Sequence, residues 1–297
     1  GNGNRVQVID ALANKTTTYY NAANEVVLAV DAEGSITAFA YDANGNRVSM
    51  TRFATALATT ADPAVRPVPV TDPLHDQTSL YLYDRNNRLV RTIDGEGYVV
   101  DTQYDALGNV VARKGYANKL VGNPALPLAG QVPAPHADDR LTQFQYDNVD
   151  RLVRRIDAEG AQTTYAYDAV GNRTQETRFL DALDLTDPAK QEVTRMAYDA
   201  MNRVTIETSS LNVQTKYTYD LVGNRLSTTE AFGLTEARTW QYAYDDLNRA
   251  ISETNPEGTV TRLIFDAASQ LVQKIEAVGL PKQRTTHNVY DANGRLT

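Results

Sequence analysis

The feature that most constrains the fold of this chain is one short phrase, spelled YDAVGNR at residues 167–173, that recurs in variant spellings along its length. Each copy begins with an aromatic residue: Tyr20, Tyr41, Tyr83, Tyr104, Tyr146, Tyr167, Tyr198, Tyr219, Tyr244, Phe265 and Tyr290. The next residue is Asn21 in the first copy and aspartate in the others: Asp42, Asp84, Asp105, Asp147, Asp168, Asp199, Asp220, Asp245, Asp266 and Asp291. Repetition in phase predicts a repeat architecture, in which each unit stacks on its neighbours.

The fourth residue after each aromatic indicates what the phrase builds. This position holds Asn24, Gly45, Asn87, Gly108, Asp150, Gly171, Asn202, Gly223, Asn248, Ser269 and Gly294. Glycine, asparagine and aspartate are the residues that most readily adopt positive φ. Aspartate followed three residues later by such a residue is typical of a type I turn that closes a β-hairpin. We therefore expect a hairpin turn in each copy, with the aspartate carboxylate accepting backbone N–H groups.

A second turn signal lies eleven residues after the aromatic in five copies, at residues 31–34, 94–97, 157–160, 209–212 and 255–258, spelled DAEG, DGEG, DAEG, SSLN and NPEG. The segments between the two kinds of turn are about six residues long, which suits strands of about 20 Å. Two residues before the repeat aromatic, most copies carry another large side chain, such as Phe39, Tyr81 or Tyr217. Residues two apart share one face of a strand, so that face is expected to carry an aromatic ladder.

The spacing of the copies alternates between a fixed step of 21 residues and a longer step in which an insertion replaces the second turn. The two largest insertions span about residues 52–80 and 113–141 and hold eight of the eleven prolines: Pro63, Pro67, Pro69, Pro73, Pro124, Pro127, Pro133 and Pro135. Proline cannot donate to a β-ladder, so loops are expected there. Nothing marks a domain boundary, and we expect residues 1–297 to form a single array of repeats that is a fragment of a longer one.

Arginine follows the turn at one of two positions. It is the fifth residue after the aromatic at Arg88, Arg151, Arg203, Arg249 and Arg295, and the sixth at Arg47, Arg173 and Arg225. A one-residue shift moves a side chain to the other face of a strand unless a β-bulge absorbs it, so bulges are expected beside these turns. The arginines are candidates to stack on tyrosine rings, to pair with aspartates or to bind acidic glycans.

Composition excludes several classes of function. The chain has no cysteine, which rules out disulfides, thiolate metal sites and a cysteine nucleophile. Its net charge of −8 argues against a nucleic-acid partner, because such a partner needs a basic field. No apolar run approaches the roughly 20 residues of a membrane span.

No motif predicts a catalytic, metal or cofactor site. The three histidines, His75, His136 and His287, are far apart in the sequence. Acidic turns such as Asp31 with Glu33 recur at equivalent positions, whereas a catalytic pair needs one distinct environment. The segment DANGN at 42–46 begins like a calcium loop but lacks the later glycine and glutamate of that loop. We expect no enzyme activity, no metal and no cofactor.

The YD dipeptide, the G-N-R or N-R-L that follows it, and the D-x-E-G turn together resemble the YD-repeat, or Rhs-repeat, family. The resemblance covers essentially the whole chain and is weakest at Asn21 with Glu25, at Val110 and at 265–271 (FDAASQL), where the least regular copies are expected. It implies an all-β fold, a repetitive antiparallel β-hairpin ribbon that curves into part of a hollow shell. In bacterial members, such as Rhs effectors and the BC part of Tc toxins, the shell encloses a C-terminal toxin, and teneurins carry a related shell extracellularly.

The resemblance favours a non-catalytic length of shell wall from a secreted or cell-surface bacterial protein. The partners it implies are the remainder of the same chain, including an enclosed toxin, with carbohydrate and secretion-system components as further candidates. A second hypothesis is an adhesion module that binds carbohydrate or a partner protein through its loops or aromatic face. A third is a hydrolase that uses the acidic turns.

Overall fold

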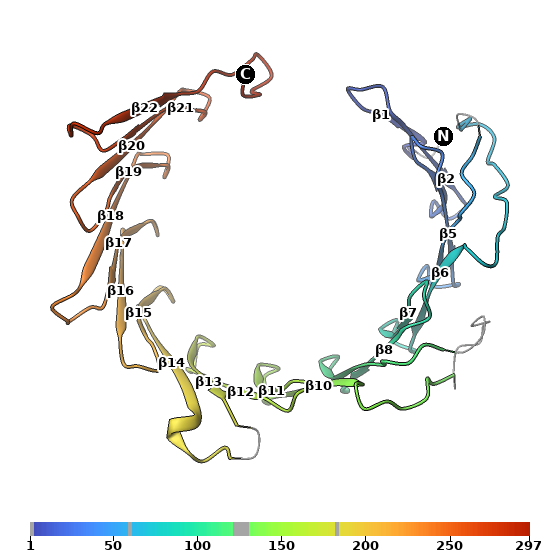
Figure 1. The fold of residues 1–297 in the computed structure, drawn as a ribbon, viewed down its shortest axis with the longest axis horizontal. Helices are drawn as coiled ribbons and strands as arrows, with labels where there is room; N and C mark the ends of the chain where they lie inside the picture. The colour runs from blue at the N-terminus through green and yellow to red at the C-terminus, as the bar shows by residue number, and fades with distance from the viewer. Residues whose placement is uncertain (1–2, 59–60, 121–130, 182–183) are drawn as a thin grey trace. The chain divides into compact units, whose positions relative to one another are not determined.

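A computed structural model describes residues 3–58, 61–120, 131–181 and 184–297 of the chain. Within these ranges the chain is all-β, as expected, apart from one short 3-10 helix, η1 (Pro188–Lys190). It separates into two compact units, unit 1 (Gly1–Gly160) and unit 2 (Ala161–Thr297). Figure 1 traces unit 1 from blue to green and unit 2 from green to red. The described residues include no helix that is long and apolar enough to cross a membrane.

Unit 1 is a meander of antiparallel strands in which each strand pairs with the next one along the chain. Its strands are β1 (Gln7–Ile9), β2 (Lys15–Tyr20), β3 (Val26–Val30), β4 (Ile36–Tyr41), β5 (Arg47–Arg52), β6 (Gln77–Tyr83), β7 (Leu89–Ile93), β8 (Val99–Tyr104), β9 (Val110–Gly115), β10 (Arg140–Tyr146) and β11 (Leu152–Ile156). Neighbouring strands are thus neighbours in sequence, which is the expected hairpin ribbon.

Unit 2 has the same construction, again with each strand paired to the next in an antiparallel ladder. Its strands are β12 (Gln162–Tyr167), β13 (Arg173–Phe179), β14 (Gln191–Tyr198), β15 (Val204–Thr208), β16 (Gln214–Tyr219), β17 (Arg225–Glu230), β18 (Arg238–Tyr244), β19 (Ala250–Thr254), β20 (Val260–Phe265), β21 (Leu271–Glu276) and β22 (Arg284–His287).

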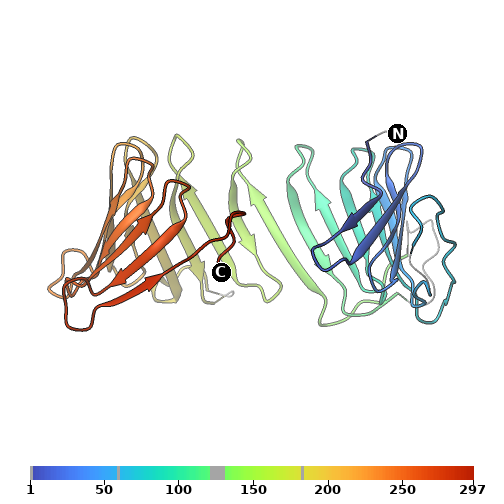
Figure 2. The same ribbon diagram turned by 90° about the horizontal axis from the view of Figure 1, so that it is seen from above.

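Two kinds of turn lie at opposite edges of each ribbon. The YD turns join one end of the strands, whereas the D-x-E-G turns and the insertions join the other (Figure 2). The second turns form where the sequence predicts them: the N–H of Gly34 donates to Asp31 O and that of Gly97 to Asp94 O, at 3.1 and 3.0 Å. Each hairpin therefore has a constant edge and a variable edge.

A β-bulge accompanies the YD turn throughout. The repeat aromatic pairs with the sixth residue after it, as in Tyr41↔Arg47 and Tyr83↔Leu89, and the register shifts just before the aromatic. The shift occurs whether arginine is at the fifth or the sixth position, because the Tyr198 and Tyr219 turns share it. The expectation of bulges is confirmed, but the cause given for it is wrong: the bulge belongs to the turn and does not absorb the displaced arginine.

The two large insertions are shorter than expected because their ends extend the strands. Residues 77–80 and 140–141 belong to β6 and β10, and β9 runs to Gly115. Residues 59–60 and 121–130, with two of the expected loop prolines, lie outside the described residues.

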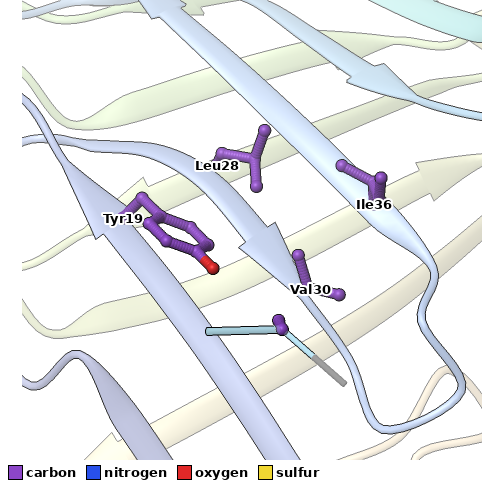
Figure 3. Close-up of a cluster of buried hydrophobic side chains, with 5 residues drawn as sticks. Tyr19, Leu28, Val30 and Ile36 are labelled. Carbon is purple, nitrogen blue, oxygen red and sulfur yellow. The ribbon is translucent and has the colours of Figure 1, made fainter. Parts of the chain in front are cut away.

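The first insertion builds a hydrophobic cluster on one face of β2, β3 and β4. Tyr19, Leu28, Val30 and Ile36 point toward one another and are almost completely buried (Figure 3). Ala61 of the insertion completes the cluster, and Phe53 and Leu57 pack against it. The cluster residues alternate with the repeat aromatics along the strands, so they occupy the face opposite the aromatic one.

The second insertion repeats this arrangement one step along the ribbon. Leu80, Ile93 and Val99 are buried beneath Tyr116 and Leu120. The backbone anchors are equivalent as well: Leu57 N–H donates to Gly34 O at 2.8 Å, and Leu120 N–H donates to Gly97 O at 2.9 Å. The core of unit 1 therefore lies between its sheet and the starts of its insertions.

Candidate functional site: the contacts between YD turns

The YD turn has one geometry in all copies. In the Tyr41 copy, Gly45 N–H donates to Asp42 O at 3.1 Å and Asp42 N–H donates to Asn46 O at 2.9 Å. The Asp42 carboxylate accepts the N–H groups of Asn44 and Asn46, each at 2.9 Å. The fourth residue has positive φ in all eleven copies, from 59° at Asn87 to 104° at Gly223. The predicted turn type is confirmed.

The copies that depart from the family spelling keep this geometry. Ser269 has a φ of 64°, and Phe265 pairs with Leu271 through the same bulge. In the first copy Asn21 replaces the aspartate, and its side-chain oxygen accepts the N–H of Glu25 at 2.9 Å. For the turn geometry, the expectation that these copies are the least regular is wrong, because asparagine and serine satisfy the same backbone requirements.

Hydrogen bonding holds the turn aspartates ionised. The side-chain amide of Asn46, together with the backbone N–H groups of the turn, lowers the pKa of Asp42 below its usual range despite partial desolvation. Below-normal pKa values recur at Asp84, Asp105, Asp147, Asp168, Asp199, Asp220, Asp245 and Asp291. A carboxylate saturated in this way is a structural acceptor and a poor general base.

The hydroxyl group of the repeat tyrosine joins each copy to the preceding one. It donates to the backbone carbonyl of the sixth residue after the aromatic of that copy. Tyr41 thus bonds Val26 O at 2.9 Å, and Tyr219 bonds Val204 O at 2.9 Å. The same bond, at 2.8 to 3.2 Å, is made by Tyr20, Tyr83, Tyr104, Tyr146, Tyr198, Tyr244 and Tyr290. Partial burial raises the pKa of Tyr41, so its hydroxyl remains a donor. Phe265 has no hydroxyl to donate.

The fifth residue makes a second contact between copies, and its chemistry explains the alternating spelling. Where the fifth residue is asparagine, its side-chain amide donates two hydrogen bonds. One goes to the aspartate of the same turn, and the other goes to the side-chain oxygen of the fourth residue after the aromatic in the next copy. Asn46 reaches Asn87 at 2.9 Å and Asn224 reaches Asn248 at 2.9 Å. Asn109 and Asn172 make the same bond to Asp150 and Asn202, respectively. A glycine copy must thus be followed by a copy with a side-chain acceptor at the fourth position.

Where the fifth residue is arginine, the contact is different. Arg203 donates through Nε to its own Asp199 at 2.8 Å and through Nη1 to the backbone oxygen of Asp220, in the next copy, at 2.7 Å. Its guanidinium also lies 4.6 Å from the centre of the Tyr219 ring. Arg88 and Arg249 make the same three contacts: each bonds its own turn aspartate and the backbone oxygen of the next copy's aspartate, and each lies over the ring of the next copy, Tyr104 or Phe265. Arg151 and Arg295 bond their own turn aspartates, Asp147 and Asp291.

The arginines at the sixth position after the aromatic lie over the rings of the residues that stand two positions before the repeat aromatics. Arg47 lies 5.9 Å from the Phe39 ring and 4.8 Å from the Tyr81 ring. Arg225 lies between Tyr217 and Tyr242 in the same way, and Arg173 lies over Tyr165. The expected aromatic ladder is therefore interleaved with guanidinium groups, and ring faces are covered by arginine.

Groups considered as catalytic candidates have local structural partners. His75 contacts Asp72 at 2.7 Å and His136 contacts Asp138 at 3.4 Å, each within its own loop. The Asp31 carboxylate caps its turn by accepting the N–H groups of Glu33 and Ser35. In the part of the chain that the structure describes, no group of three or more His, Asp or Glu side chains could hold a metal ion.

The sequence predicted that arginines stack on tyrosine rings and pair with aspartates, as Arg203 does with Tyr219 and Asp199. It did not predict the tyrosine hydroxyl bonds between copies, the asparagine bonds between copies or the anchoring of the insertions. The signal for the hydroxyl bonds was the near-constant tyrosine, since phenylalanine would fill the same space without a hydroxyl. The signal for the anchoring was a shared phrase at the start of the insertions, FATAL at 53–57 and YANKL at 116–120. In both, the second residue donates its N–H to an aspartate, Ala54 to Asp76 and Ala117 to Asp139.

These features define a class of protein: an antiparallel ribbon of β-hairpins whose copies are linked by repeated side-chain contacts. Two family models match it. The RHS Repeat model matches residues 20–56, 83–119 and 146–180, and the Teneurin YD-shell model matches residues 178–297. The two cover most of the chain, which therefore belongs to the YD-repeat (Rhs-repeat) family.

Solved structures share the fold. The chain is similar over 99% of its length to crystal structures of TcdB2-TccC3 and TcdB2-TccC3-Cdc42, each with a TM-score of 0.74, at 18% and 16% identity. A Tc holotoxin pore of Photorhabdus luminescens matches with a TM-score of 0.73 at 18% identity. The chain spans only 15 to 16% of the length of these structures. No curated protein sequence matches it.

Proposed function

We propose that residues 1–297 are a single array of YD repeats that acts as a length of shell wall and helps enclose a C-terminal toxin or effector in a larger, secreted or cell-surface bacterial protein. The observation that carries this proposal is that the polar side chains of the repeated phrase are engaged in contacts within the ribbon. Turn aspartates cap their own turns, and tyrosine hydroxyls, asparagines and arginines join one copy to the next, so the repeated groups are occupied in structural contacts.

The comparisons support the same function. The fold is that of TcdB2-TccC3, and a further matching structure is described as TcdB2-TccC3 without its hypervariable C-terminal region. The chain corresponds to a small part of those structures, and a wall built from one ribbon would be completed by further repeats. The enclosed segment would be the partner of the wall.

The adhesion alternative has less support. Sugar rings bind proteins by stacking on open aromatic faces, but here Arg225 lies between Tyr217 and Tyr242, and Arg203 lies over Tyr219. A glycan would have to displace these guanidinium groups. The hydrolase alternative has less support as well, because the acidic turns are capped by their own backbone.

The test is protease protection in the native full-length protein. Enclosure predicts that the C-terminal segment survives a protease that digests it rapidly when it is isolated. Replacing both Gly171 and Gly223 by valine places a β-branched residue at two positions that require positive φ. This should disrupt the two turns, open the wall and expose the C-terminal segment to the protease. The matched control replaces the same glycines by asparagine, which four other copies carry at this position with positive φ.

Equal digestion of the C-terminal segment in the intact protein and in isolation would refute enclosure. Binding of an immobilised glycan that is lost when Arg225 is replaced by alanine would instead favour the adhesion hypothesis.

A further inference from the structure

A cavity in unit 1 lies between strands β3 and β4 and the proline-rich part of the first insertion. It has a volume of about 710 Å³ and is lined by Leu28, Ala38 and Phe53, together with residues 66–69 of the insertion. Small-molecule sites typically measure roughly 300–1,000 Å³ and combine mostly apolar walls with a few polar groups. The size and composition of this cavity are therefore those of a ligand site.

The next pair of repeats fills the equivalent place with its own side chains. Leu28 and Ala38 are cross-strand partners, and the residues at the same repeat positions in the next pair are Arg91 and Asp101, which also pair. Arg91 Nη2 donates to Asp101 Oδ2 at 2.7 Å, and Arg91 Nη1 donates to Gln131 O of the second insertion at 2.6 Å. The second insertion is thus bound to the sheet by a salt bridge, whereas the first leaves an apolar hollow.

The polar end of the cavity departs from the repeat as well. Glu25 is the fifth residue after the first repeat aromatic, where the other copies carry arginine, asparagine or glutamine. Its Oε2 accepts the side-chain N–H of Asn21 at 2.6 Å, and a Cβ at Gly45 would be 3.1 Å from its Oε1. The carboxylate therefore lies between two successive YD turns, and Glu25, Tyr41 and Asp42 line the cavity there.

The matched copy shows which group belongs at this position. The guanidinium of Arg88 donates through Nη1 to Asp105 O at 2.8 Å and lies 4.7 Å from the centre of the Tyr104 ring. The equivalents of that oxygen and that ring in the first pair are Asp42 O and the Tyr41 ring. The first pair therefore keeps the acceptor and the ring, and it carries a carboxylate in place of the guanidinium. A carboxylate beside an aromatic ring attracts a cation.

Neighbouring charged groups leave this place open to an added cation. The Asp42 carboxylate is occupied by the N–H groups of Asn44 and Asn46. In the described part of the chain, Arg66 of the insertion is exposed and forms no ion pair with Glu25. Glu25 is thus the carboxylate that can bind a ligand.

We propose that this cavity binds a small organic cation with an aliphatic chain, such as an alkylguanidinium ion. The cationic head takes the place that the Arg88 guanidinium has in the matched copy, against Glu25 and the Tyr41 ring. The chain lies in the hollow lined by Leu28 and Ala38, where it replaces water on apolar surface.

The experiment is isothermal titration calorimetry of the chain with octylguanidinium. We expect saturable binding with a dissociation constant below about 1 mM. Octanoate has a similar chain and the opposite charge, and ethylguanidinium has the same head and a shorter chain. Each should bind at least about tenfold more weakly than octylguanidinium.

Variants of Glu25 test the binding of the head. Glu25→Gln keeps the size of the side chain and should weaken binding of octylguanidinium at least about tenfold. Glu25→Arg restores the arginine of the matched copy and should abolish binding, with the thermal midpoint retained or raised, because the new guanidinium fills the site.

The matched control is Glu33→Arg, which makes the same change of charge at an exposed turn outside the cavity. This variant should bind octylguanidinium as the parent does. The proposal is overturned if the parent shows no saturable binding up to about 1 mM, if octanoate binds as tightly, if both Glu25 variants bind as the parent does, or if Glu33→Arg weakens binding as much as Glu25→Arg. These outcomes do not depend on whether the wall encloses a cargo.

Discussion

At the scale of single residues, the tyrosine, the aspartate and the fourth and fifth residues after the tyrosine each have a defined role. The aspartate caps its own turn, the fourth residue supplies the positive φ, and the tyrosine and fifth residue reach the neighbouring copy. The turn could be predicted because it depends on residues close in sequence, such as Asp168 and Gly171. The hydrogen bonds between copies could not be predicted, because they join residues as far apart as Tyr83 and Arg47, and only the folded ribbon brings these together.

The tyrosine contact gives a reciprocal prediction. Tyr219→Phe should lower the free energy of unfolding by about 0.5–1.5 kcal/mol, because the bond to Val204 O is lost while the ring remains. Phe265→Tyr should raise it by a comparable amount or less, since the copy at Phe265 has the same register and gains the missing hydroxyl. Urea unfolding of both variants measures the effect. A neutral Tyr219→Phe would show that the hydroxyl bonds water equally well.

The left-handed turn residue gives a second prediction. Gly171 has a φ of 98° with open space around its Cα, so any cost of substitution comes from the backbone. Gly171→Val should destabilise the chain by roughly 1–3 kcal/mol, whereas Gly171→Asn should cost much less. Thermal unfolding compares the two. Equal effects would mean that the turn does not require positive φ.

Acid sensitivity follows from the turn aspartates. The hydrogen bond from Arg203 and the backbone N–H groups lower the pKa of Asp199 below the ordinary 3.8. A lowered folded-state pKa contributes stability that is complete above 3.8 and is lost as the pH falls through 3.8 toward the lowered value. Urea midpoints should therefore hold steady from neutral pH to about pH 5 and then fall.

The control for this prediction is a pair of variants. Asp199→Asn should reduce the acid-dependent loss, whereas Asp246→Asn, at an exposed tip, should leave the profile unchanged. A profile that is flat down to pH 3, or that shifts equally in both variants, would contradict the role given to the turn carboxylates.

At the scale of elements, the strands and both kinds of turn were predictable, and the packing of the insertions was not. Proline content correctly indicates loops between β5 and β6 and between β9 and β10, but it does not say where a loop folds back. Leu57 and Ala61 lie on the sheet because apolar strand residues there, Val30 and Ile36, would otherwise be exposed. Gly34 permits this approach, since a Cβ there would be 2.5 Å from Leu57 O.

Burial by the insertions predicts unequal sensitivity along the ribbon. Ile93 is 0% exposed beneath the second insertion, whereas Ile264 lies on the same side of its strand, relative to the repeat aromatic, and is 37% exposed. Ile93→Ala should cost about 2–5 kcal/mol, and Ile264→Ala should cost about 1 kcal/mol or less. Chemical denaturation measures both. Similar costs would mean that the insertion does not seal the Ile93 cluster in solution.

At the scale of the whole molecule, each unit is a ribbon of hairpins, and the buried side chains of the described residues gather in separate clusters. Among the described residues, the buried hydrophobic side chains lie in unit 1, beneath its insertions, with the exception of Ala277. Elsewhere each strand depends on its two neighbours and on the contacts between YD turns. The all-β class and the family could be recognised from the repeat alone, whereas the division into two compact units has no signal in the spacing of the copies.

Hydrogen exchange followed by mass spectrometry tests the central claim, that copy-to-copy contacts hold a continuous wall. We expect protected backbone amides in the strands of both units, rapid exchange at the tips of the YD turns, and the strongest protection in β3, β4, β7 and β8 beneath the insertions. Protection confined to the insertion-covered strands, with free exchange from β12 to β21, would show that the repeats do not support one another and would contradict the account.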